Sequence, residues 1–244
     1  MKGKGAVVSG VGVLDKAVVI LSFLSEVGPA TLAEVVEGTG LPRPTAYRLL
    51  AALEAHHLVG RGNGRYALGM RLLGWGNRAV GLDLVEAARP VLATLRDELG
   101  ESTQLYVREG DLRVCVASVE RAGGGLRDTV PVGAVLPLDR GSGGKVLLAW
   151  AEDSGRFSRI DVAELEEIRR QGWAESVAER EAGVASVSAP VFGSGGRLRA
   201  AVCASGPVSR LGERPGERLA EPVVAAAREI EEAPGSQLRP HAHQ

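Results

Sequence analysis

The 244-residue sequence predicts a mixed α/β (α+β) protein of two domains, and three observations support this fold class. Residues 31–68 contain helix and turn signals followed by an alternating segment around an Asn-Gly pair. Beyond Gly100, segments that alternate with period two are interspersed with helical ones. Charge also differs along the chain: residues 1–80 contain nine Lys/Arg against five Asp/Glu, and the remainder 20 against 25. We therefore expect a basic N-terminal domain attached to an acidic second domain.

Two helices are predicted before residue 40. Residues 14–27 place apolar side chains three or four apart, and a Gly-Pro pair follows them. Thr31 and Glu34 then form a capping box, in which the threonine hydroxyl and the glutamate carboxylate each accept a hydrogen bond from a free backbone N–H. We expect this second helix to end at Gly38 and Gly40.

A third helix is expected to begin at Pro42 or Pro44, where the missing N–H costs nothing. Its inner face is apolar and comprises Ala46, Leu49, Leu50 and Leu53. Its outer face carries the candidate DNA-binding positions Arg43, Pro44, Thr45, Tyr47 and Arg48. Arginine reads guanine edges, and hydroxyl groups bind phosphate. The pattern is typical of a recognition helix for the major groove.

A short β-hairpin is predicted after the third helix. Residues 58–68 alternate around Asn63-Gly64, which is a strong hairpin signal. Arg61 and Arg65 flank this turn, where they can contact the DNA backbone or a minor groove. Helices followed by such a hairpin predict a winged helix-turn-helix domain over residues 11–69, with double-stranded DNA as its partner.

The other boundaries follow from changes of pattern. Residues 1–10 are expected to form a flexible arm, 70–81 a linker helix that ends at Gly81, and 82–233 the second domain. Residues 234–244 are expected to be disordered. Within the second domain we expect helices at 84–99, 146–151, 162–170 and 217–232, and strands at 104–108, 112–119, 184–192 and 198–205. Pro90 should kink or divide the first of these helices, and Pro222 should lie in the first turn of the last.

Several classes of protein are disfavoured. No apolar run is long enough for a membrane span, so we expect no membrane partner. The cysteines Cys115 and Cys203 lie in apolar runs, and with four histidines they show no metal-ligand spacing; we expect no metal, no cofactor and a cytoplasmic location. A nucleotide-binding phosphate loop is also disfavoured, because it would need glycine in place of Asp139 and serine or threonine in place of Val146. We find no nucleophile or acid–base arrangement, so no enzyme is expected.

A set of short motifs resembles the IclR family of bacterial transcriptional regulators. Besides the helix-turn-helix, these are Gly141-Ser142-Gly143-Gly144-Lys145, Gly172-Trp173-Ala174, residues 179–184, Ser188-Ala189-Pro190-Val191 and Ser205-Gly206-Pro207. The resemblance covers about residues 11–233. Residues 101–106 and 125–133 are further similar to an actinobacterial branch associated with amino-acid biosynthesis, notably of leucine.

The resemblance implies a homodimer on a pseudo-palindromic operator, often paired into a homotetramer, with a GAF-like effector domain built on a curved antiparallel sheet with flanking helices. Its effector-binding positions correspond here to Gly141, Ser142, Gly143, Ser176 or Val177, Ser186, Cys203 and Ser205. Relatives that bind glyoxylate- or pyruvate-type effectors carry an acidic residue near Ser176 and a cysteine in place of Ser186. Because both differ here, that effector type does not carry over.

The expected function is a ligand-responsive regulator, such as a repressor, of amino-acid metabolism genes. Free N–H groups at the helix start after Gly141 would suit a carboxylate or amino-acid-like effector, whereas the glycines could simply permit a tight turn. An alternative is a regulator of a catabolic or secondary-metabolite pathway with an aromatic or other effector. Two other classes remain. An enzyme that carries a DNA-binding module would turn over its ligand, whereas an architectural DNA protein would bind DNA tightly whatever metabolite is present.

Overall fold

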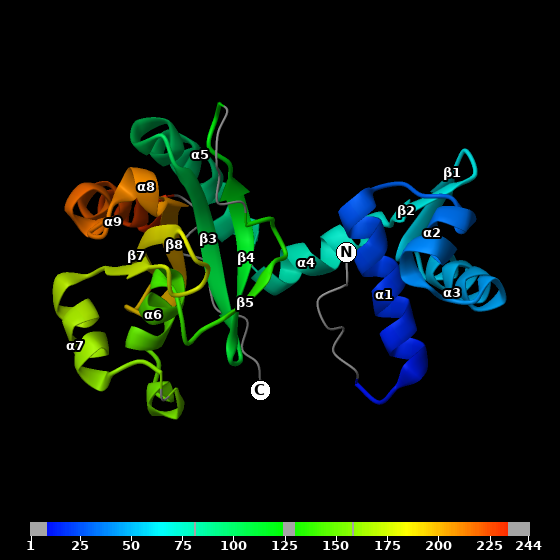
Figure 1. The fold of residues 1–244 in the computed structure, drawn as a ribbon, viewed down its shortest axis with the longest axis horizontal. Helices are drawn as coiled ribbons and strands as arrows, with labels where there is room; N and C mark the ends of the chain where they lie inside the picture. The colour runs from blue at the N-terminus through cyan, green and yellow to red at the C-terminus, as the bar shows by residue number, and fades with distance from the viewer. Residues whose placement is uncertain (1–8, 81, 124–129, 158, 234–244) are drawn as a thin grey trace. The chain divides into compact units, whose positions relative to one another are not determined.

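The computed structural model describes residues 9–80, 82–123, 130–157 and 159–233 (Figure 1). The chain divides near residue 80 into two compact units, and each is considered by itself. Residues 1–8 of the expected arm at 1–10, Gly81, residues 125–129 of the branch motif and the expected tail at 234–244 lie outside the described residues.

The N-terminal unit has the predicted order of three helices, a hairpin and a linker helix. Its elements are α1 (Gly12–Val27), α2 (Leu32–Thr39), α3 (Arg43–Ala55), β1 (Val59–Gly62), β2 (Arg65–Leu68) and α4 (Met70–Val80). A small core joins α1, α2, α3 and the hairpin; it contains Ile20, Leu24, Val35, Leu50, Leu53, Val59 and Tyr66. The strands β1 and β2 are antiparallel.

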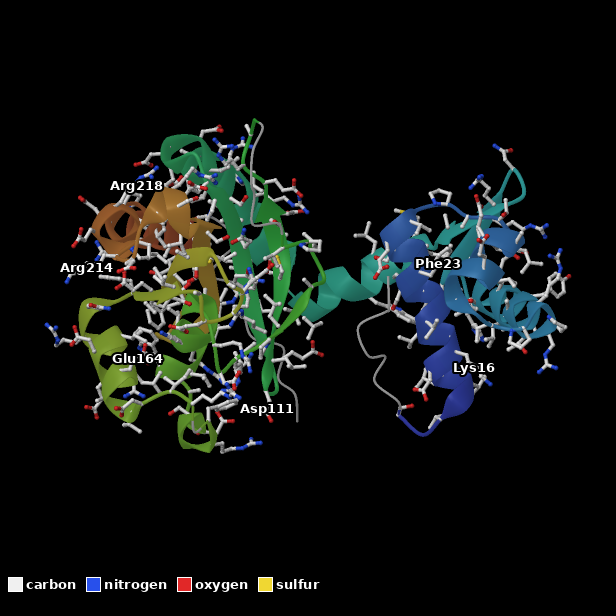
Figure 2. The ribbon with its side chains drawn as sticks, viewed as in Figure 1. Lys16, Phe23, Asp111, Glu164, Arg214 and Arg218 are labelled. Carbon is white, nitrogen blue, oxygen red and sulfur yellow. The ribbon has the colours of Figure 1, made fainter. Side chains whose placement is uncertain are left out.

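The capping box that begins α2 is confirmed. The N–H of Glu34 donates to Thr31 Oγ1 at 3.3 Å, and the N–H of Thr31 donates to Glu34 Oε2 at 2.6 Å. Gly40 ends the helix in the left-handed conformation, with φ 69°. Gly38 does not end it, because it lies inside α2. A Cβ there would collide with the ring of Phe23 on α1 (labelled in Figure 2), so this glycine allows α1 and α2 to pack closely.

The start of α3 and the hairpin turn also follow from local chemistry. Pro42 precedes the first helical residue, Arg43, and Pro44 lies in the first turn without a donor to lose. The turn residues Asn63 and Gly64 both have positive φ, 52° and 74°. This is the conformation that a tight two-residue hairpin turn requires.

The C-terminal unit is built on one six-stranded antiparallel sheet in the order β5-β4-β3-β8-β7-β6. Its helices are α5 (Leu82–Leu99), α6 (Ser142–Ala149), a 3-10 turn (Ser154–Arg156), α7 (Val162–Gln171), α8 (Val208–Leu211) and α9 (Gly216–Glu232). Its strands are β3 (Ser102–Glu109), β4 (Leu112–Val119), β5 (Val135–Pro137), β6 (Ala174–Val177), β7 (Val184–Phe192) and β8 (Leu198–Pro207).

Helices cover both faces of this sheet, with α5 and α9 on one face and α6 and α7 on the other (Figure 1). Period-two alternation along β7 separates the two faces. Ala185, Val187 and Ala189 are buried in the core that contains α5 and α9. Ser186 and Ser188 point the other way and contact Ser142 at the start of α6. Along β7 the side that faces α6 is therefore polar, whereas Tyr106, Cys115 and Ala201 on the same face of the sheet pack in a second apolar core with α6 and α7.

The predicted division of the helix at Pro90 and the predicted place of Pro222 in the first turn of its helix were wrong. The helix α5 is continuous through Pro90, and Pro222 lies at the seventh residue of α9 rather than in its first turn. In each case the carbonyl that loses its donor lies four residues earlier, at Glu86 or Arg218, which are exposed, so water can replace the lost hydrogen bond. None of the helices within the described ranges is long and apolar enough to cross a membrane.

Candidate functional site

The outer face of α3 is open to solvent at the predicted DNA-binding positions. Arg43, Pro44 and Arg48 are exposed, Tyr47 is 54% exposed, and Thr45 is half-buried. Neither Arg43 nor Arg48 forms a hydrogen bond or ion pair with any residue that the structure describes. Two cationic groups on a helix whose other face is packed are available for phosphate or base contacts.

The two wing arginines differ in how they are held. The Arg61 guanidinium lies 5.2 Å from the centre of the Tyr66 ring. Arg65 Nη1 donates to the carbonyl of Pro29 at 2.7 Å and forms an ion pair with Glu34 at 3.2 Å. The backbone N–H of Thr31 and then the Arg65 charge hold the pKa of Glu34 below its usual value. Arg65 therefore braces the wing against the start of α2.

In the C-terminal unit the glycine-rich motif forms the first turn of α6. The helix begins at Ser142, four residues before the predicted start, and Gly141 precedes it with φ 81°. A Cβ on Gly144 would collide with the carbonyl of Leu138 and with Nη1 of Arg113. The glycines thus give the turn its backbone conformation and let neighbouring groups approach the helix end closely.

A cluster of hydroxyl groups lies against this helix end. Ser142 Oγ is 2.7 Å from Ser186 Oγ, 2.8 Å from Ser188 Oγ and 3.9 Å from Cys203 Sγ. Ser205 Oγ on β8 donates to the buried Gln104 side chain at 3.2 Å. The polar side chains on this face of the sheet therefore continue from β7 to β3 beneath α6.

One cavity brings together seven of the eight predicted effector-binding positions. It is lined by Gly141, Ser142, Gly143, Ser176, Ser186, Cys203 and Ser205, together with Tyr106, Arg113, Arg180 and Val184. Its free volume of about 10 Å³ has room for one water molecule. Val177 does not line the cavity, because its side chain packs in the core on the opposite face of the sheet. Of the two alternatives near Ser176, the alternation of β6 selects Ser176.

Arg113 is the main lining residue that sequence reasoning missed. It is only 3% exposed, and its Nη1 donates to the carbonyls of Pro137 and Arg140 at 2.8 and 2.7 Å. Its guanidinium lies 5.2 Å from the centre of the Tyr106 ring, and its Nε is buried without a partner. Burial lowers the pKa of Arg113, although an arginine stays charged in proteins. The available signal was a charged side chain in the alternating segment 112–119, at a position that shares a face with Cys115.

Lys145, the last residue of the glycine-rich motif, has no phosphate-binding role in this arrangement. Its Nζ lies 2.7 Å from Glu164 Oε1 (Glu164 is labelled in Figure 2) and also contacts Glu179. Burial alone would lower the pKa of Lys145, but the hydrogen bonds and charges of the two carboxylates raise it. Glu179 also accepts a hydrogen bond from the N–H of Gly141 at 3.1 Å. This salt bridge closes the side of α6 next to the cavity.

The two cysteines are free thiols. Burial, and then the neighbouring Cys203, raise the pKa of Cys115 to about 12, so its thiol is protonated at neutral pH and is a poor nucleophile. Cys203 is 3% exposed and lines the cavity. Within the described ranges, no three His, Cys, Asp or Glu side chains are grouped so that they could hold a metal ion.

Comparison with known proteins matches one family over both units of the chain. A family described as the IclR helix-turn-helix domain matches residues 13–62, and one described as the bacterial transcriptional regulator IclR C-terminal domain matches 77–160 and 162–232. The uncharacterised HTH-type transcriptional regulator RhmR of Escherichia coli K12 is 30% identical, over 91% of this chain and 93% of its own.

Solved structures share the fold. A putative transcriptional regulator from Rhodococcus sp. RHA1 is 27% identical with a TM-score of 0.70, over 91% of this chain and 97% of its own. An IclR homologue from Microbacterium hydrocarbonoxydans, solved with 4-hydroxybenzoate, is 24% identical with a TM-score of 0.70, over 90% and 97%. The matched proteins are DNA-binding regulators and not enzymes. The chain belongs to the IclR family of bacterial transcriptional regulators.

Proposed function

We propose that this regulator senses a small carboxylate or amino-acid-like molecule in the α6 cavity and adjusts its binding to a pseudo-palindromic operator accordingly. The observation that carries the proposal is the convergence of α6, β6, β7 and β8 on one cavity lined by hydroxyls, a helix N-terminus and two arginines. Such a lining suits a small polar anion better than an apolar molecule. A regulator of chromosomal genes acts in the cytoplasm.

The DNA contacts are assigned to the exposed residues of α3 and the wing. Arg43, Thr45, Tyr47 and Arg48 enter the major groove, with Pro44 fixing the first turn. Arg61 reaches the adjacent DNA backbone or minor groove. Arg65 holds the wing in place through Pro29 and Glu34, and it can also contact a DNA phosphate. In a symmetric pair the two α3 helices contact half-sites about 10 bp apart, roughly 34 Å along the duplex.

The second DNA-binding head comes from a second copy of the chain. Apolar side chains lie exposed on α1, on the residue before it and on α4: Val11, Val13, Leu14, Val18, Met70, Leu73 and Trp75 are each at least half exposed. Large exposed apolar patches mark protein interfaces. We assign this exposed surface to a homodimer formed through α1 and α4, and two such dimers can pair into a homotetramer.

Effector binding has to change the cavity. A molecule larger than one water must displace lining side chains from α6 or from the strands beneath it. The ligand then binds more tightly to the arrangement with the enlarged cavity than to the arrangement with the small one. Such a difference in binding free energy is what shifts the populations of two states. We propose leucine-biosynthesis and other amino-acid genes as first targets; the alternative is a catabolic or secondary-metabolite pathway with an aromatic effector.

The first prediction concerns the recognition helix. An operator is first selected from random DNA with the purified protein, and Kd is then measured at fixed salt. Arg43→Ala or Arg48→Ala should each lose about 1–3 kcal/mol, a 5- to 150-fold rise in Kd. Arg170→Ala removes the same charge from an exposed residue of α7 and should leave Kd unchanged. Equal effects of all three changes would contradict the assignment.

The second prediction concerns the effector. Operator binding is measured with leucine, methionine, branched-chain keto acids and 4-hydroxybenzoate, the last as a probe of the aromatic alternative. We expect leucine, methionine or a branched-chain keto acid to change the operator Kd by about 5-fold or more, the usual size of allosteric coupling, whereas a response to 4-hydroxybenzoate alone would favour the aromatic alternative. Specific DNA binding that is indifferent to every compound would instead favour an architectural role.

The third prediction concerns the homodimer. Leu73→Glu or Trp75→Glu places a charge in the exposed apolar surface of α4, and should shift the chain toward monomer in sedimentation velocity. The matched control is Val162→Glu, because Val162 is 59% exposed at the start of α7, where an acidic residue suits the helix. Unchanged sedimentation of the α4 variants would exclude α4 from the interface.

A further inference from the structure

The charged lining of the α6 cavity has one sign. Arg113 and Arg180 are the charged residues that line it among the described residues. Burial lowers the pKa of Arg113 and the charge of Arg180 adds to this, whereas the charge of Asp139 acts in the opposite direction. Because Arg180 pairs with Glu181, Arg113 is the lining cation that attracts an anion to the cavity.

The carboxylates near the cavity pair with cations other than Arg113. Glu181 pairs with Arg180 at 3.3 Å. Glu179 binds Lys145 and the N–H of Gly141. Asp139 pairs with Arg140 and Arg159, at 3.3 and 3.2 Å. None of these carboxylates lies within ion-pair distance of the Arg113 guanidinium.

Arg113 itself is an unusual buried cation. Buried arginines normally pair with a carboxylate, because an unpaired charge in the interior is costly. Here the protein supplies two carbonyl oxygens and the Tyr106 ring, and the structure gives Arg113 no ion pair with any described residue. Its Nε is buried without a hydrogen-bond partner among the described residues. The guanidinium therefore retains capacity to bind an anion.

A second set of donors lies beside it. The backbone N–H groups of Ser142 and Gly143, in the first turn of α6, have no hydrogen-bond partner among the described residues. A Cβ built on Gly141 would stand 3.0 Å from Nη2 of Arg113, so the guanidinium lies close to this helix end. The binding of Glu179 to the N–H of Gly141 already shows a carboxylate at the same helix end.

We infer that Arg113 is the anion-recognition residue of the effector cavity, and that the effector presents a carboxylate between the Arg113 guanidinium and the first turn of α6. This inference rests on the proposed function, because it names the chemical class of the molecule that the regulator senses. A primary amide of the same shape would place an NH₂ group against these donors and would leave buried donors unpaired.

The wild-type protein provides the first arm of the test. Calorimetric titrations compare pyruvate, 4-methyl-2-oxopentanoate, L-leucine and 4-hydroxybenzoate, each with its primary amide. We expect at least one carboxylate to bind, and its amide to bind at least tenfold more weakly. Binding of an amide as tightly as its carboxylate, or no binding of any carboxylate at millimolar concentration, would overturn the inference.

Substitutions provide the second arm. Arg113→Gln should raise the Kd of the carboxylate that binds by at least tenfold and leave the Kd of its amide unchanged. Arg113→Lys should recover part of the lost affinity. Arg108→Gln is the matched control, because Arg108 lies opposite Arg113 in the β3–β4 register but is held by Asp153 at 2.6–2.7 Å and does not line the cavity. Full affinity in a folded Arg113→Gln protein would overturn the assignment. If both Arg113 variants fail to fold, the wild-type comparison of carboxylate with amide decides.

Operator binding separates this inference from the proposed function. An operator Kd that responds to a neutral compound and to no carboxylate would overturn the anion assignment while leaving the sensor function intact. A carboxylate that binds through Arg113 without changing operator affinity would support the anion assignment and overturn the sensor function. Both are read from titrations of the same wild-type protein.

Discussion

Burial of the Arg113 guanidinium beside the N-terminus of α6 is the constraint on which the polar half of the C-terminal unit depends. A cation at the positive end of a helix dipole is unfavourable, so the surroundings must compensate. The carbonyls of Pro137 and Arg140 and the ring of Tyr106 do so in part. Gly144 leaves the space that this arrangement needs. The glycine-rich motif therefore serves both packing and the polarity of the cavity.

This arrangement also explains how sensing can be coupled to movement. The lining residues come from the start of α6, from the segment after β6 and from five strands of the sheet (β3, β4, β6, β7 and β8), so a molecule that enlarges the cavity must shift at least one of these elements. A coupling of 1–3 kcal/mol is enough for a regulator, whereas complete conversion between two states would require about 5.5 kcal/mol of differential binding. A charged contact with Arg113 can supply energy of the smaller size.

The sequence predicts best those features that local chemistry determines. The Thr31–Glu34 capping box, the Asn63-Gly64 turn and the long alternating strands are all in place because each needs only neighbours in the chain. The strands β5 and β6, three and four residues long, were missed because so short a segment shows little periodicity. Proline was overweighted, because exposed carbonyls tolerate the loss of a donor.

The DNA-binding face was predicted from the residues themselves, whereas the effector cavity was predicted only in part. The face of α3 followed from helical periodicity, whereas the effector positions followed from family resemblance and are supported here by their convergence on one cavity. The choice between Ser176 and Val177 needed the register of β6 with β7. Arg113 could not be assigned from sequence, because its hydrogen-bond partners lie 24 and 27 residues away. These partners are backbone carbonyls and not carboxylates, and this lack of a counter-charge is what marks Arg113 as a binding residue.

The most direct test of the account is the reciprocity between the two sites. The carboxylate identified by titration is bound to the free protein and, in a parallel measurement, to the protein saturated with operator DNA. Linkage requires the Kd of the carboxylate to change by the same factor as the carboxylate changes the Kd of the operator. We predict equal factors of about 5-fold or more. A carboxylate Kd that is the same with and without operator would contradict the claim that the cavity controls DNA binding.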